Sequence, residues 1–431
     1  MYAHRPAFDT VADMIGKGKK VPESLLEIFA QNPEYSAKLD SLINAKDKVP
    51  FKIFDKKNAE KLFGKNLNIS ASQLEKFNLC RFSYFCNYGL NVRERQRAEI
   101  NPMQYGTIVH YILERFFGEY TKEEYLSLEE DKFQKIVCAY LAEYAVKYFG
   151  EEQLESNSFT YRLKTILDNV MYLMKHIMEE LSQSEFFVAD CELKIGEDIP
   201  SYTIVLPDGH KIAVCGSVDR VDIMQRADIT YLRIIDYKTG TKQFKLSDIL
   251  YGINLQMLLY LHSIEASGGD KYGEIVPAGI LYMPATVPYI SSDSLKSIDK
   301  LPDELNKKLK MNGLLLKDTE IIHGMDKTDV ATYIPVKIKA GEPVSSTSLA
   351  TLAEFGKIFK KVDMLIAEMG KNIYNGNIEA KPLKGGHDSC EYCPYDSVCA
   401  YRQSNPITCF SVDNKTVIEE ITNEINGKEE E

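Results

Sequence analysis

The sequence predicts an α/β domain in which a small central sheet is flanked by helices. Two observations support this prediction. Helical periodicity runs from about Met103 to about Ser184, and residues 188–238 then read as strands separated by turn residues. A second helical stretch and a further apolar strand follow, and this order of helices and strands is typical of the α/β class.

The first 65 residues are expected to form a helical extension without a core of its own. They are polar, rich in lysine and interrupted by Pro22, Pro33 and Pro50. Residues 66–405 are expected to form the main domain, and residues 406–431 a C-terminal tail.

A short capped helix is predicted at the start of the main domain. Ser70 or Ser72 can accept a hydrogen bond from the first turn, and Leu74, Phe77 and Cys80 then recur at three-residue spacing. Cys80 is therefore expected on the inward stripe of this helix. The long helical region that follows has a broad apolar face formed by Ile108, Val109, Ile112, Leu113, Phe116 and Phe117.

Three strands are predicted between residues 188 and 238. Their sequences are VADCELKIG, KIAVCGSVDRVDIM and TYLRIIDYK, and the turns between them are PDGH and QRAD. Residues 247–266 return to helical periodicity, AGILYMPAT reads as a further strand, and residues 349–376 read as a long helix. The lysine-rich stretch between them, Ser291–Lys339, is expected to be mobile.

Composition excludes several classes of protein. The sequence has 44% hydrophobic residues, and it contains neither an apolar run of about 20 residues nor a signal peptide's apolar middle, so a cytoplasmic protein is expected. No stretch fits the phosphate-binding pattern GxxxxGK[ST], so this chain is not expected to hydrolyse ATP.

The net charge of −11 argues against a nucleic-acid partner held by overall charge, because phosphate neutralisation dominates such binding. A nucleic-acid role would need a local basic patch or a helper protein. Asn91–Arg97, NVRERQR, offers three arginines for such a patch, although a solvated surface run explains them equally well.

The segments GSVDRVD and RIIDYKTG carry the most informative chemistry. Alternate residues of a strand share a face, so Asp236 and Lys238 point the same way while Tyr237 points oppositely and packs. A hairpin through the QRAD turn would bring Asp219 alongside Asp236. Two adjacent carboxylates can hold Mg²⁺ or Mn²⁺ for phosphodiester hydrolysis, with Lys238 stabilising charge. The alternative is a surface hairpin with ordinary solvated acids, which is the commoner origin of such a short pattern.

Two helices add polar groups that an apolar core does not need. His110 and Glu114 lie four residues apart on one helix face, where an imidazole could complete the coordination of the ion. Gln256 and Tyr260 repeat this spacing on the helix after the DYK strand. A single helical histidine is more often structural, so His110 alone does not establish a metal site.

In this order, the segments GTIVH, GSVDRVD, IDYKTG and QMLLY resemble the RecB-family PD-(D/E)XK nucleases, which have a restriction-endonuclease-like core. The resemblance implies His110, Asp219 and Asp236 as metal ligands, together with the main-chain carbonyl of Tyr237. It also implies Lys238 as the catalytic lysine. Gln256 and Tyr260 would contact DNA or support the site.

Cysteines narrow the resemblance. The chain has Cys80 ahead of the nuclease segments and C-x2-C-x5-C behind them, and so looks most like the C-terminal nuclease domain of AddB proteins. That likeness implies a [4Fe–4S] cluster held by Cys80, Cys390, Cys393 and Cys399. Thiolate tetrads also bind zinc, and reduced free thiols are a further alternative. Cys86 is the rival to Cys80 as a ligand.

The resemblance implies an exonuclease domain that cuts single-stranded DNA ends during double-strand-break repair, beside an AddA-like helicase–nuclease subunit. Two alternatives stay open. One is a stand-alone iron–sulfur exonuclease of the CRISPR-associated RecB-like type, and the other is a non-catalytic DNA-binding or scaffold module.

Overall fold

A computed structural model describes residues 4–16, 19–44, 52–93, 102–150, 156–240, 243–288, 301–345, 347–399, 401 and 406–429. The arginine run predicted as a basic patch lies, beyond Arg93, outside the described residues.

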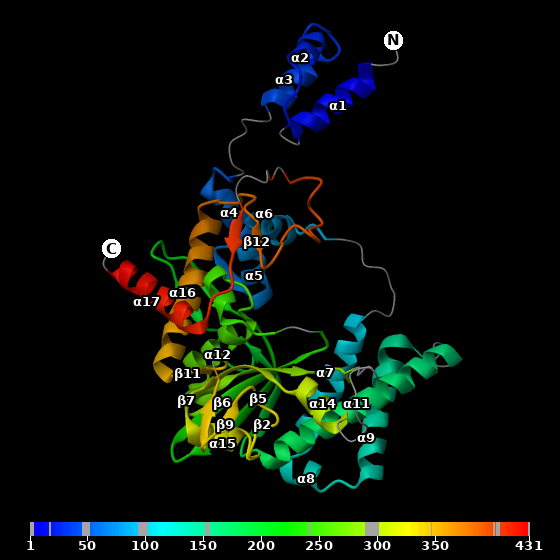
Figure 1. The fold of residues 1–431 in the computed structure, drawn as a ribbon, viewed down its shortest axis with the longest axis vertical. Coiled ribbons are helices and arrows are strands. Elements are labelled where there is room, and N and C mark those ends of the chain that lie inside the picture. Colours follow the sequence, from blue (N-terminus) through cyan, green and yellow to red (C-terminus); the bar gives the residue numbers. More distant parts are fainter. Residues whose placement is uncertain are drawn as a thin grey trace.

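A six-stranded mixed sheet forms the centre of the main domain, in the order β11-β8-β7-β6-β5-β2 (Figure 1). These strands are β2 (Phe187–Ile195), β5 (Gly216–Arg226), β6 (Ile229–Lys238), β7 (Glu274–Pro284), β8 (Asn312–Leu316) and β11 (Leu349–Ala350). β6 pairs with β7 in parallel, whereas the β2–β5, β5–β6 and β7–β8 pairs are antiparallel. The predicted α/β class with a central mixed sheet is therefore confirmed.

Helices cover both sides of this sheet. On one side lie α7 (Pro102–Glu119), α8 (Lys122–Leu126), α9 (Glu130–Phe149) and α11 (Asn157–Gln183), which confirm the long helical region. Around the other side lie α12 (Gln256–Ser267), α16 (Leu352–Tyr374) and α17 (Asn414–Glu429) (Figure 1). Within the described part of the chain, no helix combines the length and the apolarity that crossing a membrane requires.

The N-terminal helices α1 (His4–Gly16), α2 (Glu23–Ala30) and α3 (Ser36–Asn44) stand apart from the sheet (Figure 1). The expected helical extension is confirmed, but the expectation that it lacks a core is wrong. Phe8, Phe29 and Tyr35 pack ring against ring with centroids 4.8–5.5 Å apart. These aromatic contacts, together with buried Val11 and Leu39, give the three helices a small hydrophobic cluster.

The prediction of a mobile stretch at 291–339 is wrong for its described residues, 301–339. They form α14 (Leu301–Leu309), β8, α15 (Thr319–Met325) and β9 (Lys337–Lys339), which pairs with β10 (Glu342–Val344). The lysines obscured the apolar run NGLLL, which enters the central sheet as β8. Lys310 is itself held, because its Nζ donates to the carbonyls of Ala331 (2.6 Å) and Val336 (3.1 Å).

The segment KIAVCGSVDRVDIM, predicted as one strand, is divided at Cys215. Its first part, β4 (Lys211–Val214), joins β1 (Asn66–Ile69) and β3 (Thr203–Val205) in a separate small sheet, and its second part is β5. Gly216 begins β5 because a Cβ there would lie 2.2 Å from the Tyr260 hydroxyl oxygen. The close approach of α12 therefore requires glycine at this position.

Shorter elements complete the fold: α4 (Lys56–Phe63), α5 (Ala71–Leu79), α6 (Arg81–Tyr84), the π-turn η2 (Phe85–Gly89), the 3-10 turn η3 (Leu246–Tyr251), α13 (Gly269–Tyr272), β12 (Leu383–Gly385) and β13 (Ile407–Cys409). Ser70 caps α5 in a capping box with Gln73. Cys80 follows α5 as its C-cap residue and is buried, as its place on the inward stripe predicted.

A buried histidine joins two helices of the main domain. His262 on α12 lies 3.0 Å, from Nε2, from Oδ1 of Asp363 on α16, and its ring stacks on Phe359. Burial would lower the pKa of His262, but hydrogen bonds to Asp363 and Glu265 raise it to about 9. The protonated ring therefore stabilises the fold fully below a pH near 6.5, and this stabilisation is lost as the pH rises through 9.

We expect His262→Gln to lower the free energy of unfolding by on the order of 2 kcal/mol at pH 6, and by less at pH 10. Urea unfolding curves at both pH values measure this difference. The control is His323→Gln, which changes an exposed histidine. A destabilisation by His262→Gln that is equal at the two pH values would show that the ion pair contributes nothing.

Candidate active site

The β5–β6 hairpin brings two aspartates together, as the sequence predicted. Its register pairs Arg220 with Ile235, and one step further this register sets Asp219 opposite Asp236. The main-chain N–H of Tyr237 donates to Asp219 Oδ2 at 2.8 Å, which fixes the first carboxylate against the neighbouring strand.

Asp236 is held on both of its oxygens. Lys238 Nζ lies 2.5 Å from Oδ2, and Gln256 at the start of α12 donates from Nε2 to Oδ1 at 3.1 Å. The carboxylate is 3% exposed as a residue, so its negative charge needs these partners. The predicted strand alternation is also present, because Tyr237 turns away and is buried.

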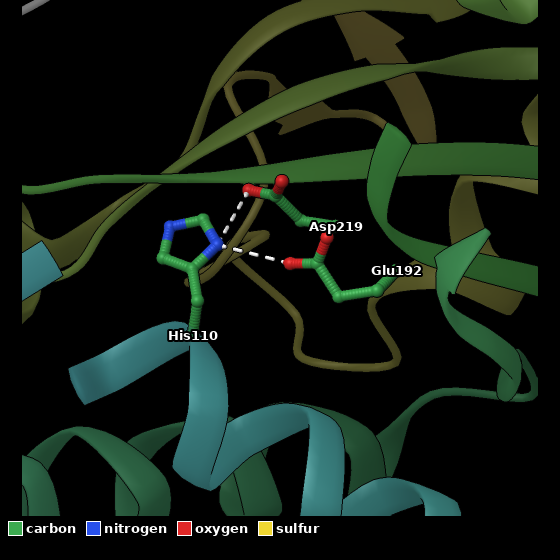
Figure 2. A group of neighbouring side chains, drawn as sticks. All are labelled: His110, Glu192 and Asp219. Carbon is green, nitrogen blue, oxygen red and sulfur yellow. Dashed lines mark hydrogen bonds and ion pairs between the residues drawn. The ribbon is translucent and has the colours of Figure 1, made fainter. Parts of the chain in front are cut away.

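His110 reaches the same place from α7. Its Nδ1 lies 3.2 Å from Glu192 Oε1 and 3.6 Å from Asp219 Oδ2 (Figure 2). Glu192 belongs to β2, where the pairs on either side of it set it opposite Asp219. Ser217 donates from Oγ to the other oxygen of Glu192 at 2.8 Å. One ligand atom from each of His110, Glu192 and Asp219 lies within 4.8 Å of the others.

The electrostatics of this group show that it requires positive charge. Burial, followed by the charge of Asp236, raises the pKa of Asp219 to about 7. Burial would lower the pKa of His110, but the hydrogen bond to Glu192 and the charge of Asp219 raise it to about 9. A proton on His110 therefore offsets part of the carboxylate charge, and a divalent cation would do so more fully.

Glu192 is the residue that the sequence did not identify. Its φ of +50° is in the left-handed region, which is strained for a residue other than glycine. Glu114, noted in the sequence, lies close by, because burial followed by the charge of Glu192 raises its pKa. Strand alternation carries no signal for Glu192, since this φ departs from regular strand geometry.

Tyr260 supports the site from behind. The residue is buried, and its hydroxyl oxygen is placed so close to Gly216 that no side chain fits between them. Burial, partly offset by a hydrogen bond with the main chain of Ala71, raises its pKa to about 12. Of the two roles predicted for Tyr260, this geometry favours supporting the site over contacting DNA.

The far side of the hairpin carries a buried charge network. Arg220 donates to Asp222 (2.8 Å) and Glu180 (3.1 Å), and Arg233 donates to Asp222 (3.0 Å) and Glu180 (2.6 Å). All four side chains are fully buried. Arg220 also donates to the Tyr237 hydroxyl at 3.3 Å, so the network is connected to the residue between Asp236 and Lys238.

The predicted cysteine ligands gather at the junction of α5 and α6. Cys80, Cys393 and Cys399 pack with Phe82 and Tyr395 in one cluster. Burial, then Cys80, Cys393 and Cys390, raise the pKa of Cys399, so all four thiols are within electrostatic range of one another. Cys86 shares this cluster, since burial, Cys399 and Cys393 raise its pKa too.

A mixed sheet whose hairpin presents Asp219 beside the Asp236–Lys238 pair, with a histidine from a covering helix, defines the PD-(D/E)XK class of nuclease. The chain matches the PD-(D/E)XK nuclease superfamily over residues 68–400 and belongs to it. The family resemblance seen in the sequence is thereby confirmed. Nucleases of this superfamily use divalent metal ions, which suits the acidic group described above.

Similar proteins are named as one component, the AddB polypeptide, of an ATP-dependent helicase/deoxyribonuclease. The chain is 34% identical over 354 residues to the one from Thermoanaerobacter sp. (strain X514), covering 79% of this chain and 30% of that protein. It is 33% identical over 427 residues to the one from Ruminiclostridium cellulolyticum, covering 94% and 37%. With the one from Clostridium kluyveri it shares 35% over 397 residues, covering 88% and 34%. The chain thus spans about a third of the length of these relatives.

Proposed function

We propose that this chain is a divalent-metal-dependent deoxyribonuclease domain that hydrolyses phosphodiester bonds. The observation that carries the proposal is the hairpin that fixes Asp219, Asp236 and Lys238 beside His110. Within the superfamily, these are the residue types that hold the ion and stabilise charge during cleavage.

The proposed ligands are Asp219, Asp236, His110 and the main-chain carbonyl of Tyr237, and Glu192 joins them on geometry. A bound Mg²⁺ or Mn²⁺ would polarise a phosphoryl oxygen and lower the pKa of a bound water. Lys238 puts a positive charge, 2.5 Å from Asp236, next to the position where negative charge develops. Gln256 and the Tyr237 N–H hold the two aspartates in place beforehand.

We further propose that the domain works in an AddAB-type helicase–nuclease, in the cytoplasm, on single-stranded ends during double-strand-break repair. The names of the relatives support this proposal. An AddA-like partner would supply ATP-driven unwinding. The net charge of −11 fits a domain that receives DNA from a partner instead of capturing it alone.

The test is cleavage of single-stranded DNA labelled at either end, with Mg²⁺, Mn²⁺ or a chelator. We expect cleavage that requires the metal and proceeds from an end. Cleavage without any helicase partner present would favour a stand-alone exonuclease over a partner-dependent domain. DNA binding without cleavage in either metal would overturn the proposal in favour of a scaffold.

We propose a [4Fe–4S] cluster at Cys80, Cys390, Cys393 and Cys399. A tetrahedral zinc site with bonds of about 2.3 Å needs sulfurs about 3.8 Å apart. Among the described residues, no three of these sulfurs lie within 4.8 Å of one another, and this wider arrangement suits a larger cluster. The cluster would join Cys80 to a segment near residue 390, and closing so long a loop restricts the unfolded chain.

Cys80→Ser is expected to lose bound iron and to lower the melting temperature by roughly 4 °C or more, because the long loop is no longer closed. Iron and zinc contents and the visible absorption of the purified protein measure the loss. Cys138→Ser, outside the cluster, is the control. If Cys86→Ser loses the iron and Cys80→Ser keeps it, the assignment of Cys80 is wrong.

A further inference from the structure

A polar cavity of about 390 Å³ lies between α5, η3 and the chain that follows β12. Leu79 and Ile253 give it an apolar wall, and Glu75, Asp248 and Asn254 line it with polar groups. Its size falls within the range of about 300–1,000 Å³ that small organic groups occupy. None of these residues has a part in the metal site described above.

The cavity is one side chain away from the catalytic group. Asp236 pairs across the sheet with Tyr282 of β7, and the Tyr282 hydroxyl donates to Asn254 Oδ1 at 3.3 Å. Lys238 Nζ lies 5.7 Å from the centre of the Tyr282 ring. Burial, then the charges of Asp236, Glu75 and Asp248, raise the pKa of Tyr282, so this phenol lies between the two groups of acids.

Asp248 is the buried acceptor of the cavity. Its side chain is 8% exposed, and the contacts of its carboxylate in the described part of the chain are long. They run 3.4 Å to Asn254 Nδ2 and 3.7 Å to His387 Nε2, so short hydrogen bonds do not use its acceptor capacity. Glu75 is anchored, since its Oε1 accepts from the main-chain N–H of Leu255 at 2.7 Å.

The polarity of the cavity defines the ligand. Two carboxylates repel a phosphate, although Lys245 and His387 also line the cavity. A carboxylate accepts hydrogen bonds and donates none, so the ligand must bring N–H groups, and the wall of Leu79 and Ile253 needs an apolar face. A nucleobase with an exocyclic amino group has both.

We infer that this cavity receives a base of the DNA strand lying across the active site, and that Asp248 favours bases bearing an amino group. The inference rests on the proposed nuclease function. Cytosine, adenine and guanine each present amino hydrogens, whereas thymine and uracil present two carbonyl oxygens around a single N–H. These carbonyls face the carboxylate unfavourably.

The experiment compares two substrates that differ at one base. Labelled oligo-dT strands carry a single dC at successive positions, and a matched set carries dU, which replaces the amino group by a carbonyl. At one fixed distance from the cut, we expect the dC strand to be cleaved at least about fivefold faster, as one good base contact predicts. Asp248→Asn should reduce this ratio toward one.

Asp228→Asn, in the exposed turn of the β5–β6 hairpin, is the matched control and should keep both the ratio and the rate. Metal-dependent cleavage with equal dC and dU rates at every position would overturn the cavity inference and leave the nuclease function standing. An undiminished ratio in Asp248→Asn would overturn it as well. If no strand is cleaved in Mg²⁺ or Mn²⁺, both the proposed function and this inference fail.

Discussion

Asp236→Ala is expected to reduce metal-dependent cleavage of single-stranded DNA by at least about a thousandfold. The substitution removes a buried carboxylate that is proposed to bind the ion. It also removes the group that holds Lys238 (2.5 Å) and Gln256 (3.1 Å) in place. Initial rates on end-labelled DNA at saturating Mg²⁺ measure the effect.

The matched control for Asp236→Ala is Asp228→Ala, in the same hairpin but in its exposed turn. We expect the control to cleave at the rate of the unsubstituted chain. Melting temperatures separate loss of chemistry from loss of fold, and removing a buried like charge beside Asp219 should not lower that temperature greatly. Cleavage that persists in Asp236→Ala would mean that another site, or a contaminant, performs the reaction.

Local regularity explains why much of this site could be predicted. Asp236 and Lys238 share a face because a strand alternates, and Asp219 meets them because the QRAD turn closes a hairpin within a few residues. Gln256 was distinctive because it is polar at the start of an apolar helix that directly follows the strand. The contact of Gln256 with Asp236 agrees with that reasoning.

The residues that escaped prediction depend on pairing between distant parts of the chain. Glu192 enters the site through the register of β2 on β5 and through a left-handed backbone that breaks the alternation. β8 lies between lysine-rich flanks, and only its pairing with β7 reveals it as a strand of the central sheet. Periodicity within one segment carries no information about either pairing.

The buried charge network was missed for the same reason, because Arg220 and Asp222 look like surface charges in a strand pattern. Their acceptor Glu180 belongs to α11, about 40 residues earlier in the chain. Together with Arg233 the group contains two positive and two negative side chains. The network is therefore balanced, although burial alone would favour the neutral form of each acid.

Glu180→Ala is expected to lower the free energy of unfolding by about 3–5 kcal/mol, since it leaves two buried arginines facing a single carboxylate. Arg220 and Arg233 each lose a hydrogen bond, of 3.1 and 2.6 Å. The neighbouring exposed residue gives the control, and Glu179→Ala should change the same quantity by less than about 0.5 kcal/mol. Urea unfolding of the three proteins at one pH measures the difference.

A second effect of Glu180→Ala separates anchoring of the site from mere stability. Arg220 holds the Tyr237 hydroxyl at 3.3 Å, and Tyr237 is proposed to offer its carbonyl to the metal. Loosening Arg220 should therefore raise the Mg²⁺ concentration needed for half-maximal cleavage, measured well below the melting temperature, by roughly tenfold, as for other residues that orient metal ligands. A variant that is destabilised as expected but needs no more Mg²⁺ would show that the network stabilises the fold without positioning the site.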